Sequence, residues 1–416
     1  MPTPPRTSTL TGPHLVAAVC AAQVLVQLGA FFWPALLPGL VPQWGLNNRE
    51  AGWITAAFYG AYLLAVPILV TLTDRIEARL VYLFGVACTI IAHLLFGLIA
   101  DGFWSALVLR ALAGIGWAGT YMTGLKLLAD QVDKTLMSRA TAGHAASIGI
   151  SGAASFACAD VFANAWGWHS AFLIAAGTAA AAWIIVAVYA PRRAAPPPPP
   201  ADGQALFDFR PVFRNQSAMA YAVAYCIHTL EMNALRGWGV AFLAWVAAST
   251  GAQANFSPTW VLTALGIIGT FASVFGNEAA IRWGRVRLIT LAMLASTAVS
   301  IALGYVGTLS YSVAVALLLV YGFVVWLDSS SLTAGAAGTA EPSRRGATLA
   351  VHSMLGYSGG FVGPLMIGYT LDLAGGMSRT GWAVSFGLIA ALMLAALAAF
   401  RVMRPRELAG DRSKNA

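Results

Sequence analysis

Three ionisable residues that could bind an ion or exchange a proton lie within one long, mostly apolar stretch of the chain: His228, Glu231 and Arg236. His228 and Glu231 are three residues apart, about 60° around a helix and about 4.5 Å along it, so they can share a proton. Glu231 and Arg236 are five residues apart, about 140° around a helix. We therefore expect them to pair directly only if the helix is broken at Gly237 and Gly239, the glycines that follow.

The same residues also allow a structural interpretation. Arg236 could extend along apolar surface and place its charge at the edge of the membrane, and His228 could be a packing residue. A carboxylate is too short to reach the surface in this way, and an ionisable group inside a membrane is costly without a partner or water. Glu231 is therefore the best single candidate for a functional group.

A second carboxylate, Asp328, precedes four hydroxyl residues, Ser329, Ser330, Ser331 and Thr333. Such hydroxyls either line a polar path or satisfy one another between helices. Because burial and a nearby cation shift a carboxyl pKa in opposite directions, Glu231 or Asp328 could exchange a proton near neutral pH.

The first half of the chain contributes further candidates. Gln23 and Gln27 are four residues apart, so they share one helix face and offer uncharged donors and acceptors. Arg110 lies within an apolar run, where an anion-binding role and a structural role are both open. Lys126 has Asp130 one turn further on, which predicts an ion pair at the end of a span.

The elements that must position these residues are membrane-spanning helices. The chain has 416 residues, of which 59% are hydrophobic and 10% are charged, whereas about a quarter of a soluble protein is charged. A helix needs about 20 apolar residues to cross a hydrocarbon core of about 30 Å, and the sequence contains about twelve such runs. We expect spans at 14–41, 51–72, 80–100, 103–128, 138–161, 168–190, 216–248, 257–277, 286–307, 309–337, 346–372 and 380–401. The predicted fold class is an all-α membrane protein with twelve transmembrane helices.

The positive charges indicate the topology. Most of the 24 Lys and Arg residues fall in the terminal segments and in the loops after the even-numbered runs, while Arg49 and Arg379 fall on the opposite side. Positive loops stay in the cytoplasm, so we expect a multi-pass protein of the cell (inner) membrane with both termini cytoplasmic. The first run is too long for a signal-peptide core, and we expect it to be kept as a span.

The chain divides at a proline-rich segment and repeats itself across it. Five consecutive prolines favour extended polyproline II, so we expect an N-terminal bundle at 1–190, a cytoplasmic linker at 191–211 and a C-terminal bundle at 212–416. The halves match at a shift of roughly 207 residues, as a duplicated transporter would. The matches include Trp53 with Trp260, Arg75 with Arg282, Arg139-Ala-Thr with Arg345-Gly-Ala-Thr, and His144 with His352.

With this layout and three local motifs, the chain resembles the major facilitator superfamily over nearly its whole length. The motifs are Thr73-Asp-Arg-Ile-Glu-Ala-Arg79, Arg110-Ala-Leu-Ala-Gly-Ile-Gly116 and Gly167-Trp-His-Ser-Ala-Phe172. The first is a degenerate copy of the loop signature, because Val70 and Glu77 stand where the family has glycines. The resemblance implies two six-helix bundles around a central cavity that opens alternately to each side. It also implies conformational gating by Asp74, Arg75 and Arg79.

Several function classes receive no support from the sequence. We find no histidines with metal-ligand spacing, no phosphate-binding glycine loop and no nucleophilic triad, so we expect no cofactor and no enzymatic activity. The distribution of the basic residues argues against nucleic acid as a partner. The stretch Ser147–Ser155 lacks the proline of the family's antiporter signature, which disfavours export.

We therefore predict a monomeric, proton-coupled symporter for a small organic or inorganic anion. Arg236 and Arg110 would attract the anion, Gln23 and Gln27 would contribute to binding, and Glu231, His228 or Asp328 would carry the proton. The alternative is proton-driven efflux of amphiphilic drug-like compounds, for which 14 Trp and 20 Phe could form a greasy cavity. A third possibility is a membrane sensor or an intramembrane enzyme. A sensor would normally carry an appended soluble domain and an enzyme a cluster of catalytic residues, and we find neither in the sequence.

Overall fold

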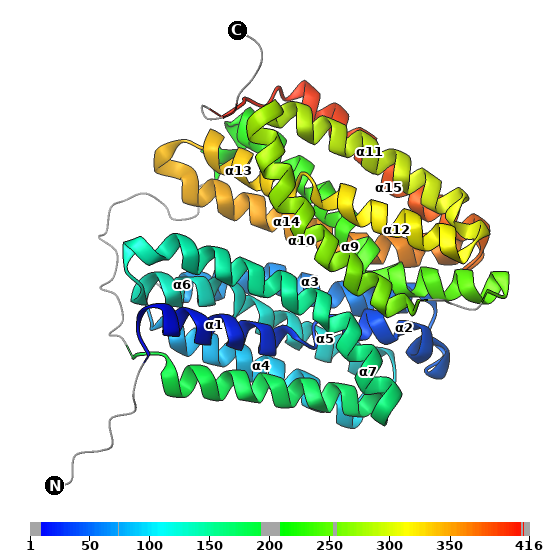
Figure 1. Cartoon of the computed structure of the whole chain (residues 1–416), viewed down its shortest axis with the longest axis horizontal. Coiled ribbons are helices and arrows are strands. Elements are labelled where there is room, and N and C mark those ends of the chain that lie inside the picture. The colour runs from blue at the N-terminus through cyan, green and yellow to red at the C-terminus, as the bar shows by residue number, and fades with distance from the viewer. Residues whose placement is uncertain (1–9, 74, 193–208, 253–255, 409–410, 412–416) are drawn as a thin grey trace. The chain divides into compact units, whose positions relative to one another are not determined.

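The computed structural model describes residues 10–73, 75–192, 209–252, 256–408 and 411, and all regular secondary structure in these residues is helical (Figure 1). The α-helices are α1 (Gly12–Gln27), α2 (Phe32–Gln43), α3 (Asn48–Leu72), α4 (Ala78–Ile99), α5 (Phe103–Ala118), α6 (Tyr121–Gln131), α7 (Lys134–Tyr189), α8 (Arg210–Arg214), α9 (Gln216–Thr250), α10 (Pro258–Trp283), α11 (Arg285–Tyr305), α12 (Tyr311–Trp326), α13 (Ser329–Thr339), α14 (Arg345–Leu373) and α15 (Arg379–Val402). These helices confirm the all-α prediction, and each expected span has its counterpart.

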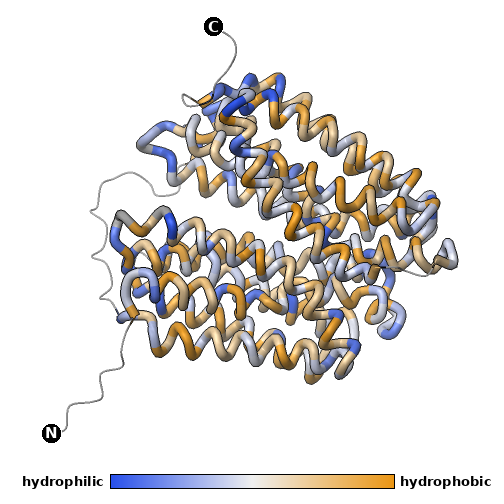
Figure 2. The backbone as a smooth tube through the Cα atoms, viewed as in Figure 1, coloured by the Kyte–Doolittle hydropathy of each residue, from blue (hydrophilic) through white to orange (hydrophobic). Residues whose placement is uncertain are grey.

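The spans differ from their expected boundaries by only a few residues. Eight segments in the described part of the chain are long and apolar enough to cross a membrane. One of them, α7, contains two expected spans, because Gly167 interrupts it with a φ of 81° that favours glycine. Figure 2 shows apolar residues along the helices and hydrophilic residues mainly near their ends, as expected for helices in a bilayer.

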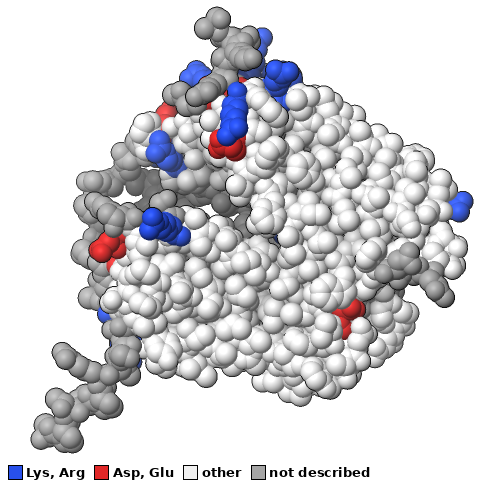
Figure 3. Space-filling model, viewed as in Figure 1, with Lys and Arg blue, Asp and Glu red and all other residues white. Residues whose placement is uncertain are grey.

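The outer surface fits a lipid environment. Many large apolar side chains are exposed, among them Leu64, Trp104, Phe271 and Leu373. On the face drawn in Figure 3, charged side chains are few and the remaining surface is uncharged. A water-soluble protein would bury apolar side chains of this kind, so this surface is typical of one that contacts lipid.

The contacts divide the chain into two compact units, residues 1–33 with 61–201, and residues 34–60 with 202–416. This grouping differs from the expected division because residues 34–60 pack with the second unit. The start of α3 lies against α14, where Asp372 accepts hydrogen bonds from Asn48 and Arg49. Most of the expected linker, 193–208 of 191–211, lies outside the described residues.

Three spans are broken within their length. The first is interrupted at 28–31 between α1 and α2, the fourth at 119–120 between α5 and α6, and the tenth at 327–328 between α12 and α13. The breaks at 119–120 and 327–328 are separated by nearly the same number of residues as the matching positions in the two halves of the sequence. The repeat is therefore visible in the helix breaks as well as in the sequence. The break at Gly237 and Gly239 that direct pairing of Glu231 with Arg236 would require is absent, because α9 is continuous from Gln216 to Thr250.

Those two glycines and a row of glycines on α14 instead allow helices to approach closely. A side chain at Gly237 would meet Thr55 and Pro364, and a Cβ at Gly359 would lie 2.0 Å from the carbonyl oxygen of Cys226 on α9. Gly363 has a similar approach to the carbonyl oxygen of Leu230. Small residues therefore bring the backbones of α9 and α14 together, which fixes the position of the helix that carries Glu231.

We expect Gly359→Ala to destabilise the second unit by about 1–3 kcal/mol, because the new methyl group must push α14 away from α9. Thermal unfolding of the purified protein in detergent measures the effect. Gly387→Ala is the matched control, since outside the local backbone of its own helix no atom lies within 4 Å of the added Cβ in the described chain. Equal melting of the two variants would show that the close approach does not matter.

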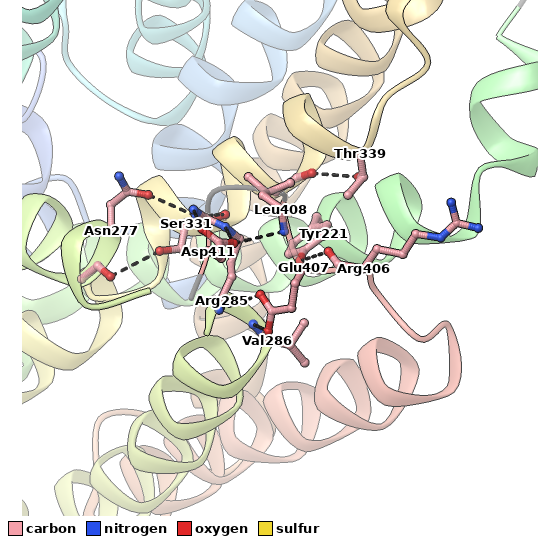
Figure 4. Close-up of polar contacts among 12 residues, drawn as sticks. Tyr221, Asn277, Arg285, Val286, Ser331, Thr339, Arg406, Glu407, Leu408 and Asp411 are labelled. Atoms are coloured by element: carbon pink, nitrogen blue, oxygen red, sulfur yellow. Dashed lines mark hydrogen bonds and ion pairs between the residues drawn. The ribbon is translucent and has the colours of Figure 1, made fainter. Parts of the chain in front are cut away.

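The carboxyl-terminal segment is fastened to the second unit by a buried ion pair (Figure 4). The Arg285 guanidinium donates two hydrogen bonds to the Asp411 carboxylate, from Nε and Nη2, each at 3.0 Å. The remaining Nη1 donates to Asn277 and to the Ser331 carbonyl, each at 3.1 Å. Glu407 accepts from the backbone N–H groups of Arg285 and Val286, which caps the start of α11.

Removing one partner of this pair leaves a buried charge, so Asp411→Ala should cost about 3 kcal/mol and lower the melting temperature by about 5 °C or more. The Arg282–Glu278 pair provides the control, because its side chains are 66% and 56% exposed. Glu278→Ala should change stability by less than about 1 kcal/mol. A melting temperature for Asp411→Ala that equals that of Glu278→Ala would contradict the assignment.

Candidate functional site

Glu231 lies in the interior of the second unit between three helices. Its exposed fraction is 1%, and its Oε1 accepts hydrogen bonds from Ser296 of α11 at 2.6 Å and from Tyr321 of α12 at 2.5 Å. Both hydroxyls donate to the same oxygen, so they stabilise a negative charge there. The arrangement holds the carboxyl group in one place and provides partners for its ionised form.

His228 and Asp328 form a second buried group beside Glu231. The Nδ1 atom of His228 lies 3.0 Å from Asp328 Oδ1, and the two side chains are 2% and 5% exposed. Asp328 occupies the break in the tenth span, where its carbonyl oxygen begins α13 by accepting from Leu332. The 3.0 Å approach lacks hydrogen-bond geometry, and neither His228 Nε2 nor Asp328 Oδ1 has a hydrogen-bond partner in the described part of the chain. The pair therefore has a site at which a proton or a ligand can be accepted.

Aromatic and hydroxyl side chains extend this group toward α14. The Tyr225 ring stacks on His352 at a centroid distance of 4.0 Å and on His228 at 5.6 Å. His352 Nε2 lies 3.2 Å from the hydroxyl of Thr333. His352, the repeat counterpart of His144, is thus linked to His228 through the Tyr225 ring. We call the set His228, Glu231, Asp328, Ser296 and Tyr321 the acidic cluster.

Arg236 lies on the same helix as His228 and Glu231, among aromatic side chains. Its guanidinium carbon is 4.8 Å from the centroid of the Trp326 ring, a cation–π contact. The phenol groups of Tyr59, Tyr225 and Tyr357 are close enough to interact with it electrostatically.

The first unit holds the two glutamines in its interior. Gln23 and Gln27 are 0% and 5% exposed, and each amide oxygen accepts one hydrogen bond, from Tyr82 at 3.2 Å and from Ser151 at 3.3 Å. Neither Nε2 atom has a partner among the described residues. Each glutamine therefore retains donors that an oxygen-rich ligand can use.

Arg110 serves the break in the first span. Its side chain is buried, and its Nη1 donates to the carbonyl oxygen of Ala30 at 3.0 Å, within the interruption between α1 and α2. A broken helix leaves carbonyl groups without intrahelical partners, and the guanidinium satisfies one of them. This contact supports the structural role that was left open for Arg110.

The three gating candidates fall in different environments. Arg79 is buried and donates to the carbonyl oxygens of Val186 and Ala187 near the end of α7, at 3.3 and 2.5 Å. Arg75 is exposed, and Asp74 lies outside the described residues. Elsewhere in the first unit, the predicted Lys126–Asp130 ion pair is confirmed, with oxygens 2.5 and 2.6 Å from Nζ.

Comparison with known proteins agrees with this architecture. A family model described as Major Facilitator Superfamily matches residues 19–364. A bacterial homolog of the human lysosomal transporter Spinster, in an inward-facing and occupied conformation, is similar with a TM-score of 0.78 and 15% identity over 97% of this chain and 98% of that one. The nucleoside transporter NupG has a TM-score of 0.75 and 13% identity over 94% and 98%.

A POT family transporter in complex with a thioalcohol-conjugated peptide is also similar, with a TM-score of 0.74 and 13% identity over 96% of this chain and 99% of that one. At these identities the likeness shows the fold alone. A search of curated proteins found no match.

Proposed function

Because the chain belongs to the Major Facilitator Superfamily and shares its fold with solved transporters, we propose that it takes up a small organic or inorganic anion together with protons. On this proposal it works as a monomer in the cell (inner) membrane, with both termini in the cytoplasm. The positive-inside distribution of Lys and Arg supports the orientation.

The acidic cluster carries the proposal. A carboxyl group inside a membrane bundle is costly, and here it is held by two hydroxyl donors next to a second, histidine-paired carboxylate. In the proposed cycle Glu231 takes up a proton on one side and releases it on the other. Ser296 and Tyr321 stabilise the ionised state, and His228 with Asp328 offers the neighbouring acceptor.

Arg236 provides the proposed site for the anion. Its guanidinium can form two parallel hydrogen bonds to a carboxylate or an oxyanion, and the surrounding tyrosines can donate further ones. Within the first unit, Gln23 and Gln27 are proposed as uncharged donors to substrate oxygens, since their Nε2 groups have no partners in the described chain.

Proton and anion binding should favour each other because both occur on α9. Ionised Glu231 repels an anion near Arg236, and for charges about 10 Å apart at an effective dielectric constant of about 20 the cost is roughly 1.5 kcal/mol. Protonating Glu231 removes this cost, so it should raise anion affinity about tenfold, and bound anion should favour protonation by the same factor. Such reciprocity is what symport requires.

Uptake into proteoliposomes tests the proposed function. Labelled small carboxylates and inorganic anions should accumulate inside when the outside is made acidic, and a protonophore should collapse the accumulation. Failure to accumulate any of them, together with extrusion of an amphiphilic dye, would instead establish the alternative, proton-driven efflux.

A further inference from the structure

A cavity distinct from the acidic cluster lies at the end of the second unit where α9 begins and α15 ends. Its volume is about 700 Å³. It is lined by Arg214 and Asn215 before α9, by Glu341 after α13, and by Arg404 and Arg406 after α15. On the proposed topology this end faces the cytoplasm, at the level of the lipid headgroups.

The cavity is positively charged. Three arginines and one glutamate line it, and the first N–H groups of α9 add the partial positive charge of a helix start. In the described part of the chain, none of the guanidinium groups of Arg214, Arg404 and Arg406 makes a hydrogen bond or an ion pair. Three arginine forks are thus available for one ligand.

The segment that supplies two of these arginines is held in a fixed position. The N–H of Arg406 donates to Ser217 at 2.9 Å, and its carbonyl oxygen accepts from Tyr221 at 2.8 Å. In Figure 4 the side chain of Arg406 extends away from this network. Arg404 has a φ of 49°, the one positive value at a non-glycine position in the described chain. Such backbone strain persists only where surrounding contacts impose it.

We propose that this cavity binds a ligand that carries a phosphate group. A phosphate offers oxygens in the geometry that arginine forks match, and a helix start accommodates the same charge. The phosphate can belong to an anionic lipid of the adjacent leaflet or to a soluble phosphorylated compound. Bound ligand would join the segment at 404–406 to the start of α9, the helix that carries His228 and Glu231.

Binding to the purified full-length protein in detergent tests the proposal. Dioctanoyl phosphatidic acid, inorganic pyrophosphate and dioctanoyl phosphatidylcholine would be titrated separately, with bound molecules counted by native mass spectrometry. We expect saturable binding of phosphatidic acid, of pyrophosphate, or of both, and no saturable binding of the zwitterionic lipid. Binding of phosphatidic acid alone assigns the site to lipid, and binding of pyrophosphate assigns it to soluble phosphate compounds.

Substitutions locate the binding. Arg404→Gln and Arg406→Gln should each weaken it about tenfold, because each removes a charge-assisted contact. Glu341→Gln should strengthen it, and Arg282→Gln, an exposed arginine outside the cavity, should leave it unchanged. The same melting temperature in all variants would show that folding is intact. No phosphate-specific binding, or binding that is indifferent to Arg404 and Arg406, would overturn the proposal.

Discussion

Glu231→Gln is expected to reduce proton-driven accumulation of substrate by more than tenfold while leaving substrate exchange across the membrane in place. Glutamine keeps the size of the side chain and can accept from Ser296 and Tyr321, but it cannot release a proton. The carrier would therefore still change its conformation with substrate bound, without coupling to the gradient. Accumulation and counterflow in proteoliposomes measure the two properties separately.

The control for this variant is Glu278→Gln, which changes an exposed carboxyl group on α10. It should accumulate substrate as the parent does. Tyr321→Phe and Ser296→Ala each remove one donor to the same oxygen, so intermediate losses are expected. Normal accumulation by Glu231→Gln would exclude Glu231 as the proton carrier.

Arg236→Ala should lower the affinity for the transported anion by about 10–100-fold, because a charge-assisted, two-bonded contact contributes about 1.5–3 kcal/mol. Arg236→Lys keeps the charge without the fork and should recover part of the loss. Binding of the labelled anion to purified protein gives the affinity directly, independent of coupling.

Arg282→Ala is the matched control, since that arginine is exposed and pairs with Glu278 on its own helix. Trp326→Leu removes the ring under the guanidinium and should weaken binding less than Arg236→Ala does. An Arg236→Ala variant with unchanged affinity would move the anion site elsewhere and leave Arg236 a packing role.

The spans were predictable from the sequence because a bilayer imposes a length and an apolar composition on each helix. The expected run at 286–307, for example, became α11 at Arg285–Tyr305. The breaks that divide a single span into two helices were less predictable. The breaks at 119–120 and 327–328 fall in otherwise apolar runs without a proline, and the single charge of Asp328 was not enough to predict the second break.

The site was predictable in part. Glu231, His228 and Asp328 stood out as ionisable residues in apolar runs, but their spacing could not tell which helix faces which. Ser296 and Tyr321 were missed because single hydroxyl groups are ordinary in membrane helices, and only packing brings them to one carboxyl oxygen. A search for hydroxyl residues at mid-span on other helices would have included both, among many others.

The glycines after Arg236 show how one residue type carries two meanings. A break and a close helix contact both favour glycine, and the sequence offered no way to choose. The contacts of Gly237 with Thr55 and Pro364 decide for packing. Similarly, the sequence allowed Arg110 either to bind a ligand or to stabilise the fold. The hydrogen bond from Arg110 to the carbonyl oxygen of Ala30, seen only in the structure, favours the second role.

The most direct measurement follows proton movement during transport, in proteoliposomes that enclose a pH-sensitive dye. Addition of the transported anion outside, without an imposed gradient, should acidify the interior with the parent protein and leave the pH unchanged with Glu231→Gln. Anion entry with no acidification by the parent, or equal acidification by both proteins, would contradict the role assigned to the acidic cluster.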